Sequence, residues 1–229
     1  MALSADQIST LVALCEPFRD SQAPSGYRDS LALCVIDSVQ STGVTYASVV
    51  SVVNRYRAYR RAQGGDPESD GAEELVATFG ELNGAEGWAH EIGNDNKTST
   101  HRGAPLKSAA IHLAAQALVL EGVSAAQDLR DAVSKTEAQE RIQGEWLKVP
   151  GQRSGITWHY VRMLAGVPGV KPDRMIIRFV AQALDVPARQ VSPEFAREAV
   201  TGAAREMGVS PTDLDHGIWQ WQRRKRPQH

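Results

Sequence analysis

The chain is poor in cysteine: its 229 residues contain only Cys15 and Cys34. This count excludes a disulfide-stabilised secreted domain and favours a reducing compartment. No long uninterrupted apolar run is present, which excludes a membrane-spanning helix. The first residues carry Asp6 and Glu16 and lack a basic start, so they are not typical of a signal peptide. We therefore expect a soluble, cytoplasmic protein.

The chain also has little net charge, −2 at neutral pH, which is not typical of a protein that coats nucleic acid non-specifically. Its cations are nevertheless grouped, whereas acids gather in residues 66–74 and 128–145. The basic groups are Arg55, Arg57, Arg60 and Arg61; Lys97, Arg102 and Lys107; Arg153, Arg162, Lys171 and Arg174; and Arg223 to Arg226. Each group has two interpretations, a nucleic-acid contact or a solvated helix face.

Strand-like alternation is nearly absent, and apolar residues recur instead at helical spacing. The clearest helical patterns cover residues 4–18, 28–40, 46–62, 106–120, 137–147, 156–165, 193–207 and 211–221. Residues 88–105 are polar and rich in Gly, Asn and Thr, which predicts a long exposed loop that is functional or mobile. These patterns predict an all-α fold, and 42% hydrophobic residues are enough for a substantial core.

The most informative segment is residues 146–180, in which a Pro-Gly turn separates two helical patterns. A short turn leaves the first backbone N–H groups of the second helix without intrahelical acceptors, and such a terminus attracts phosphate. Asp173 follows Gly151 by 22 residues and precedes a third apolar pattern. The segment therefore predicts a phosphate-binding turn with a carboxylate near it.

This arrangement resembles the helix-hairpin-helix DNA glycosylase superfamily (HhH-GPD), the fold of endonuclease III and the adenine glycosylases. Residues 149–151, Val-Pro-Gly, match the opening of that family's hairpin, and residues 173–178 match its catalytic aspartate and the following helix. Two positions depart from the family. Arg153 replaces the second hairpin glycine, and Gly155 occupies the position of the lysine nucleophile in members with lyase activity. The second departure argues against a Schiff-base mechanism.

A second match lies in residues 31–56, which are similar to the first barrel helix of the same superfamily and the start of the next helix. In the family this helix ends in Gln followed by Ser or Ala and Thr, and Gln40 falls on the glutamine that probes DNA beside the extruded nucleotide. The loop of residues 88–105 corresponds to a DNA-contacting family loop and is enlarged here. The two matches together span about residues 30–184.

The resemblance implies an all-α, two-lobed fold with DNA bound between the lobes. The implied divisions are an N-terminal helix in residues 1–29, a helical barrel lobe in 30–135, the hairpin and catalytic-Asp helix in 136–184, C-terminal helices in 185–221 and a disordered basic tail in 222–229. Endonuclease III-like members often hold an iron–sulfur cluster on four cysteines, and the lack of cysteine after Cys34 rules that cluster out. We expect no cofactor and no metal site.

Asp173 is the expected catalytic residue, because a carboxylate stabilises the positive charge that develops on the sugar or orients the attacking water. The expected DNA contacts are Gln40, Ser41, Asn94, Asn96, Lys97, His101, Arg102, Gly151, Arg153, Ser154 and Gly155. The candidate base-pocket residues are Trp88, His90, Trp158 and His159. Core packing is expected for at least two of Trp158, His159 and Tyr160, which follow the hairpin on one helix.

Three functions remain open from the sequence. The leading interpretation is a monofunctional, monomeric DNA glycosylase-like enzyme that acts on double-stranded DNA and leaves the strand intact. The second is a DNA-binding module of the same fold that has lost excision, which the altered hairpin and the mild acidity support. The third is a helical protein-interaction domain in which the hairpin is structural. Asp173 has its own alternative, since Asp commonly does no more than cap a helix.

Overall fold

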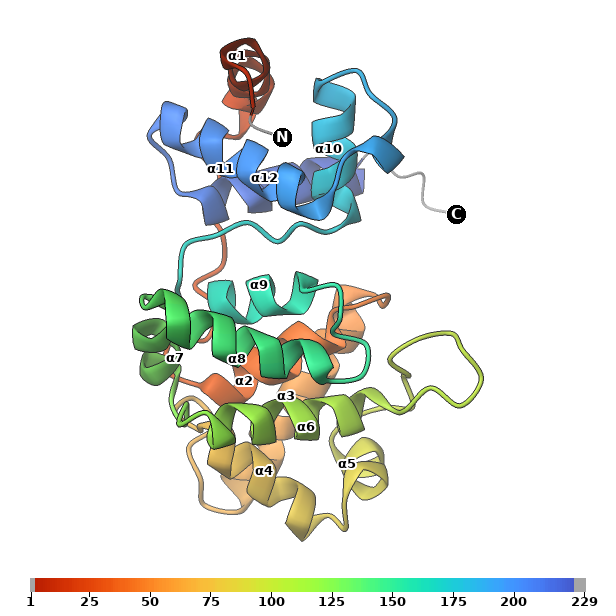
Figure 1. Cartoon of the computed structure of the whole chain (residues 1–229). Coiled ribbons are helices and arrows are strands. Elements are labelled where there is room, and N and C mark those ends of the chain that lie inside the picture. The colour runs from red at the N-terminus through yellow and green to blue at the C-terminus, as the bar shows by residue number, and fades with distance from the viewer. Residues whose placement is uncertain (1–2, 225–229) are drawn as a thin grey trace. The chain divides into compact units, whose positions relative to one another are not determined.

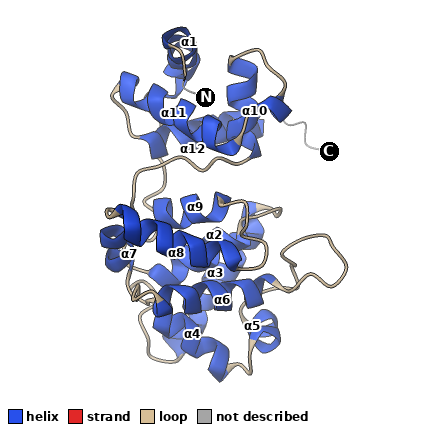
Figure 2. Cartoon of the chain, viewed as in Figure 1, coloured by secondary structure: helices blue, strands red, loops and turns tan. Residues whose placement is uncertain are grey.

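The computed structural model describes residues 3–224 as helices joined by loops (Figure 1, Figure 2). Within these residues there is no β-strand, and extended pairing is confined to an isolated bridge between Lys97 and Leu106. The prediction of an all-α fold is therefore confirmed. None of the helices in residues 3–224 has the length and apolar character needed to cross a membrane.

The chain divides into two compact units. The terminal unit contains Met1–Pro24 and Pro168–His229, and the central unit contains Ser25–Val167. The segment 136–184, expected as one division, is split between the two units, because the hairpin helices belong to the central unit and the helix after Asp173 belongs to the terminal unit.

The central unit is organised around the helix α2. Its helices are α2 (Leu31–Gln40), α3 (Tyr46–Ala62), α4 (Ala72–Glu81), α5 (Ala85–Glu91), α6 (Lys107–Leu120), α7 (Ala126–Val133), α8 (Thr136–Lys148) and α9 (Ile156–Leu164). All residues of α2 are buried, and it packs against α3, α4, α6 and α9. A mostly apolar helix is stable in this position because other helices surround it. Ser30 begins α2 by accepting the N–H of Leu33 on its hydroxyl.

The terminal unit joins the two ends of the chain. It contains α1 (Ala5–Cys15), the 3₁₀ turn η1 (Glu16–Phe18), α10 (Arg174–Ala183), the 3₁₀ turn η2 (Ala188–Gln190), α11 (Pro193–Met207) and α12 (Pro211–Arg224). Phe18, Phe179 and Trp221 pack edge to face in its core. Residues from α1 and η1 thus share one core with the last three helices.

Capping residues set several helix ends where the sequence predicts them. The helix α11 runs from Pro193 to Met207, as expected. Ser192 accepts the N–H of Phe195, and Gly208 takes the left-handed conformation, φ 67°, that commonly ends a helix.

Several boundaries differ from those expected, and two of them concern the long loop and the basic tail. The loop expected from residue 88 begins later, because residues 88–91 belong to α5: the Trp88 ring stacks on Phe79 and its Nε1 donates to Thr78 Oγ1 over 3.0 Å. Residues 222–224, expected in a disordered tail, end α12, where the Arg223 guanidinium lies 4.5 Å from the centre of the Trp219 ring. The rest of that tail, residues 225–229, lies outside the described residues.

Candidate nucleic-acid interface

The turn between α8 and α9 is compact. The N–H of Gln152 donates to Val149 O, and the N–H of Gly155 donates to Gln152 O, each over 3.0 Å. Gly151 and Gly155 take left-handed φ angles of 81° and 73°. Arg153 lies between them at a position whose φ is not left-handed, so a side chain is tolerated there without backbone strain. Arg153, which stands where the glycosylase hairpin has its second glycine, therefore does not prevent a tight turn.

A chain of buried hydrogen bonds holds this turn against both helices. Trp146 Nε1 of α8 donates to Thr157 Oγ1 of α9 over 3.0 Å, and that hydroxyl donates to Gln152 Oε1 over 2.5 Å. Gln152 Nε2 donates in turn to Pro150 O over 3.1 Å. Gln152 and Thr157 are 2% and 1% exposed, so their bonds to each other are shielded from water. Sequence reasoning misses both residues, because a single Gln or Thr near a turn carries no distinguishing pattern.

The outer side of the turn presents backbone donors. Arg153 and Ser154 are exposed, and no hydrogen bond of residues 3–224 starts from their N–H groups. The helix α9 has no side-chain cap, and the N–H groups of residues 156–158 have no acceptor among the described residues. N–H groups at a helix start carry partial positive charge and attract anions. The turn therefore has the donors that a phosphate group requires.

A long loop, residues 93–106, projects from the central unit (Figure 1). The bridge between Lys97 and Leu106 closes its base. Arg55 of α3 holds its start by donating from Nε to Ile92 O over 2.7 Å, and a second bond reaches the neighbouring carbonyl oxygen. The loop is therefore anchored at both ends, although its tip leaves the helical core.

Asn94 and Asn96 shape the base of this loop. Asn94 Oδ1 accepts the N–H of Asn96 over 3.1 Å, and Asn94 Nδ2 lies 3.5 Å from Ser48 Oγ. Asn96 O accepts the N–H of Lys107 over 2.8 Å. The side chain of Asn94 thus has a structural role, which is an alternative to the expected DNA contact, whereas Asn96 takes part through its backbone atoms.

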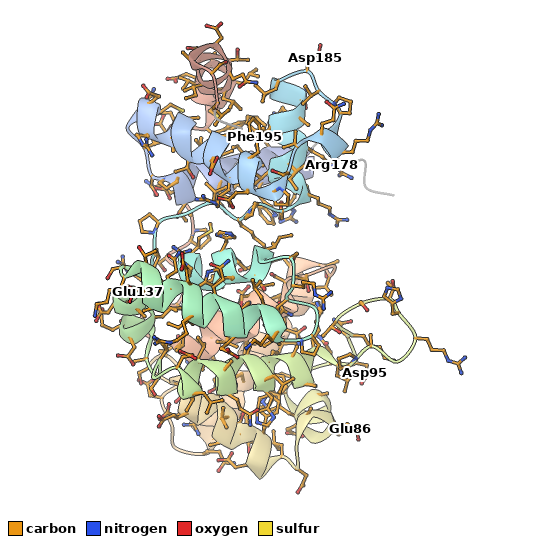
Figure 3. The ribbon with its side chains drawn as sticks, viewed as in Figure 1. Glu86, Asp95, Glu137, Arg178, Asp185 and Phe195 are labelled. Carbon is orange, nitrogen blue, oxygen red and sulfur yellow. The ribbon has the colours of Figure 1, made fainter. Side chains whose placement is uncertain are left out.

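The remaining part of the loop is cationic. Lys97, His101 and Arg102 are exposed, and none of them forms a salt bridge with another described residue. Asp95 is the acidic residue of the loop and lies near its base (Figure 3). The three basic side chains are consequently available to phosphates.

The loop base, the end of α2 and the hairpin turn meet in one region. Gly151 is so close to Thr98 that a Cβ atom on Gly151 would lie 2.8 Å from the Thr98 Cβ. Lys107 Nζ donates to Gln40 O over 2.7 Å and to Thr42 O over 2.5 Å. Lys107 is 2% exposed, so it is not the surface cation that its basic group suggested. Its ammonium group instead stabilises the carboxyl end of α2.

Gln40 lies below the surface. Its side chain is 1% exposed, and neither Nε2 nor Oε1 has a hydrogen-bond partner among the described residues. Ser108 Oγ, at the start of α6, is likewise buried and unpartnered. A direct contact between Gln40 and DNA is not possible in this conformation, because the side chain is shielded from solvent. Ser41 is half-buried, and its hydroxyl donates to Ser38 O over 2.9 Å.

A buried carboxylate lies one turn before Gln40. Asp37 is 1% exposed, and its Oδ2 accepts the Tyr27 hydroxyl over 2.9 Å, while the hydroxyl of Tyr160 from α9 bonds the same carboxylate. Burial and the charge of Asp37 raise the pKa of both tyrosines above the ordinary value. Both hydroxyls therefore remain donors at neutral pH; the Tyr160 hydroxyl ties α9 to α2, and the Tyr27 hydroxyl ties the segment before α2 to the same carboxylate. The sequence does not indicate this network.

Ion pairs neutralise three of the four arginines in the first basic group of the sequence. Arg57 and Arg61 bind Glu68 over 2.9 Å and 3.1 Å, and Arg60 binds the buried Asp70 over 2.7 Å. The hydrogen bond to Asp70 raises the pKa of Arg60. These arginines already have acidic partners, so the nucleic-acid interpretation of this group is weakened.

The candidate base-pocket residues do not gather around a cavity. Trp88 and Trp158 are fully buried in the core, so they cannot stack on a flipped base in this conformation. His90 is exposed in the last turn of α5, and His159 is half-buried in α9. A cavity of about 300 Å³ lies between α6 and α8 in the central unit, and none of these four residues lines it.

Asp173 belongs to the terminal unit, where it begins α10. Its Oδ1 accepts the N–H of Met175 over 2.7 Å and the N–H of Ile176 over 3.3 Å. The side chain is half-buried, and no hydrogen bond of the described residues involves Oδ2. Asp173 therefore caps α10 through Oδ1, as the alternative interpretation of this residue expects.

Residues 9–223 match a family described as Domain of unknown function (DUF8548). The chain belongs to DUF8548. No curated protein and no solved structure matches it. Within residues 3–224 no three His, Cys, Asp or Glu side chains are grouped as metal ligands would be. The description of DUF8548 states no activity, so the function of this member is inferred from its residues.

Proposed function

We propose that this DUF8548 chain is a monofunctional DNA glycosylase-like enzyme that extrudes a damaged or modified base from double-stranded DNA and hydrolyses its N-glycosidic bond. The observation that carries the proposal is the exposed hairpin turn, whose N–H groups at Arg153 and Ser154 lack acceptors among the described residues. The resemblance of residues 149–151 and 173–178 to the helix-hairpin-helix glycosylases supports it.

The turn would hold the DNA backbone. Its N–H groups and the Arg153 guanidinium suit phosphate oxygens, and a charged donor strengthens such a bond. The contact between Gly151 and Thr98 places the base of the cationic loop against the same turn. Contacts of this kind position a duplex without reading its sequence. Selection of the base is therefore expected from other residues.

The chemistry requires an extruded nucleotide, because the glycosidic bond of a stacked base cannot be attacked in place. When the C–N bond breaks, the bonding electrons leave with the base and positive charge develops on the sugar. A water molecule then adds to the sugar carbon, and its proton is released. The Asp173 carboxylate would stabilise the cation or orient the water. Gly155 cannot form a Schiff base, so the expected product is an abasic site in an intact strand.

The test of the enzyme is a panel of duplexes with oxidised, alkylated, deaminated and mismatched bases, treated with alkali after incubation. We expect one class of duplex to yield abasic sites. Asp173→Asn is expected to lower the single-turnover rate by about 100- to 1,000-fold with little change in DNA affinity, because Asn also caps helices well. The matched control is Asp185→Asn, after the other end of α10, where φ is 51° and Asn is tolerated. Full turnover by Asp173→Asn would remove Asp173 from the mechanism.

A salt titration tests DNA binding separately. The logarithm of the binding constant should fall steeply with the logarithm of salt concentration, and Arg153→Ala should reduce the slope by about 0.9, the value for one lost phosphate contact. Arg61→Ala, which removes an exposed arginine already paired with Glu68, is the control and should leave the slope unchanged. A binding constant independent of salt would contradict both DNA-binding interpretations.

The second candidate is a DNA-binding module of the same fold without excision. The enclosed side chain of Gln40 and the use of Asp173 Oδ1 as a helix cap favour it. This candidate predicts the salt dependence described above but no abasic product from any duplex of the panel.

A further inference from the structure

The segment that leads to Asp173 is held by one helix. Residues 169–173 are not helical, and α12 lies along them. The Thr212 hydroxyl accepts the N–H of Gly169 over 3.0 Å and donates to Gly169 O over 3.2 Å. Asp215, one turn further along α12, accepts the N–H of Lys171 on Oδ1 over 3.1 Å. The backbone is therefore anchored at two points before it reaches Asp173.

The second anchor connects directly to Asp173. The N–H of Asp173 donates to Lys171 O over 2.7 Å, which closes a tight turn across Pro172. Proline fixes its own φ and has no N–H, so this turn has few conformations. Asp215 Oδ1 accepts the N–H of Lys171, and Lys171 O accepts the N–H of Asp173. These two bonds connect α12 to the start of α10.

We infer that Asp215 is a positioning residue for Asp173: its buried carboxyl group holds the Lys171–Asp173 turn and thereby sets the direction in which the Asp173 carboxylate points. The inference rests on the proposed function, because the position of Asp173 affects excision only if Asp173 acts on DNA. Asp215 itself touches the backbone of the turn and is not assigned contact with the substrate.

The electrostatics of the pair agree with this geometry. Burial and the negative charge of Asp173 raise the pKa of Asp215 from 3.8 to about 8, although the hydrogen bond from the Lys171 N–H acts in the opposite direction. At neutral pH Asp215 therefore keeps its proton and remains a neutral acceptor for Lys171. Asp215 is suited to hold the turn without adding a second negative charge.

The experiment compares variants of Asp215 on the duplex that the panel identifies. Asp215→Ala, or Asp215→Leu if the alanine variant does not fold, removes the acceptor, and Asp215→Asn retains it. We expect the first two to lower the single-turnover excision rate by about 10- to 100-fold with unchanged DNA affinity, and Asp215→Asn to restore the rate to within a few-fold of the unaltered protein. Asp213→Ala is the matched control, because Asp213 makes an equivalent bond to the N–H of Ala23, away from Asp173.

A second measurement does not depend on excision. Hydrogen exchange of the Met175 N–H, which Asp173 Oδ1 accepts, reports the placement of Asp173. Its protection should fall at least several-fold in Asp215→Ala or Asp215→Leu and should persist in Asp215→Asn and Asp213→Ala. If no duplex is cut but protection behaves in this way, the glycosylase proposal fails and the positioning contact stands. Unchanged Met175 protection, or equal excision by the Ala, Leu and Asn variants, would overturn the inference.

Discussion

Replacing Thr157 by Val should loosen the hairpin more than its small chemical change suggests. Valine has nearly the shape of threonine but no hydroxyl group. Thr157 Oγ1 accepts from Trp146 Nε1 and donates to Gln152 Oε1, and all three side chains are almost completely buried. The substitution therefore removes two hydrogen bonds and leaves one donor and one acceptor without partners.

The magnitude follows from those two groups. A buried polar group that loses its partner costs about 1–3 kcal/mol, so the free energy of unfolding of Thr157→Val should fall by about 2–6 kcal/mol. For a chain of this size that loss corresponds to roughly 4–24 °C in the melting temperature. Circular dichroism on heating and urea titration measure both quantities. Thr157→Ser is the matched control, because it retains the hydroxyl and loses one methyl group, at a cost of about 1 kcal/mol.

The same variants test the link between this network and the proposed DNA binding. The turn residues that present N–H groups are held in place through Gln152, so Thr157→Val should also weaken binding of duplex DNA while Thr157→Ser should not. If Thr157→Val and Thr157→Ser had the same melting temperature and the same free energy of unfolding, the buried hydrogen bonds would contribute little. The argument for a pre-organised turn would then be refuted.

Two further predictions concern buried ionisable groups. Lys107→Met keeps the apolar stem but leaves Gln40 O and Thr42 O without their ammonium donor, so urea titration should show that the free energy of unfolding falls by about 2–4 kcal/mol. The control is Lys148→Met, at an exposed position, which should change the free energy of unfolding by less than about 0.5 kcal/mol. Equal effects of the two variants would argue against the role of Lys107. Asp215 makes stability depend on pH, because its pKa is raised from 3.8 to about 8 by burial and by Asp173, against the effect of Lys171. The contribution of Asp215 to the free energy of unfolding is complete below its ordinary pKa of 3.8. Above that pH the contribution falls by about 1.4 kcal/mol per pH unit, and it is lost as the pH rises through about 8. Asp215→Asn should abolish this slope between pH 4 and 8, and identical slopes in both proteins would contradict the raised pKa.

Much of the helical framework can be predicted because its signals are local. Ser192 and Gly208 mark the ends of α11, and Asp173 marks the start of α10, since each acts on backbone groups within one turn of its own position. The α8–α9 turn is predicted for the same reason: proline and glycine restrict or extend the backbone angles of the residues themselves. Apolar spacing predicts which faces are buried, but it does not say against what.

The candidate site was only partly predictable. The exposed cations of the loop and the open N–H groups of the turn lie where the sequence indicates. The enclosure of Gln40 was not predictable, because a polar residue at a helix end is normally assigned to the surface. Thr157 and Asp215 were missed for another reason: their partners Gln152 and Lys171 have meaning only once helices have packed and brought the groups into reach.

The amino-acid sequence alone determined the all-helical class, the ends of several helices and the Pro-Gly turn, because backbone preferences and helix caps depend on residues only a few positions apart. Tertiary structure alone decided that Lys107 is a buried support for α2, that Trp88 lies in the core and that Asp215 holds the turn before Asp173. Those roles arise from burial and from contacts over tens of residues, and the free energy of a polar group depends on whether water or a partner surrounds it.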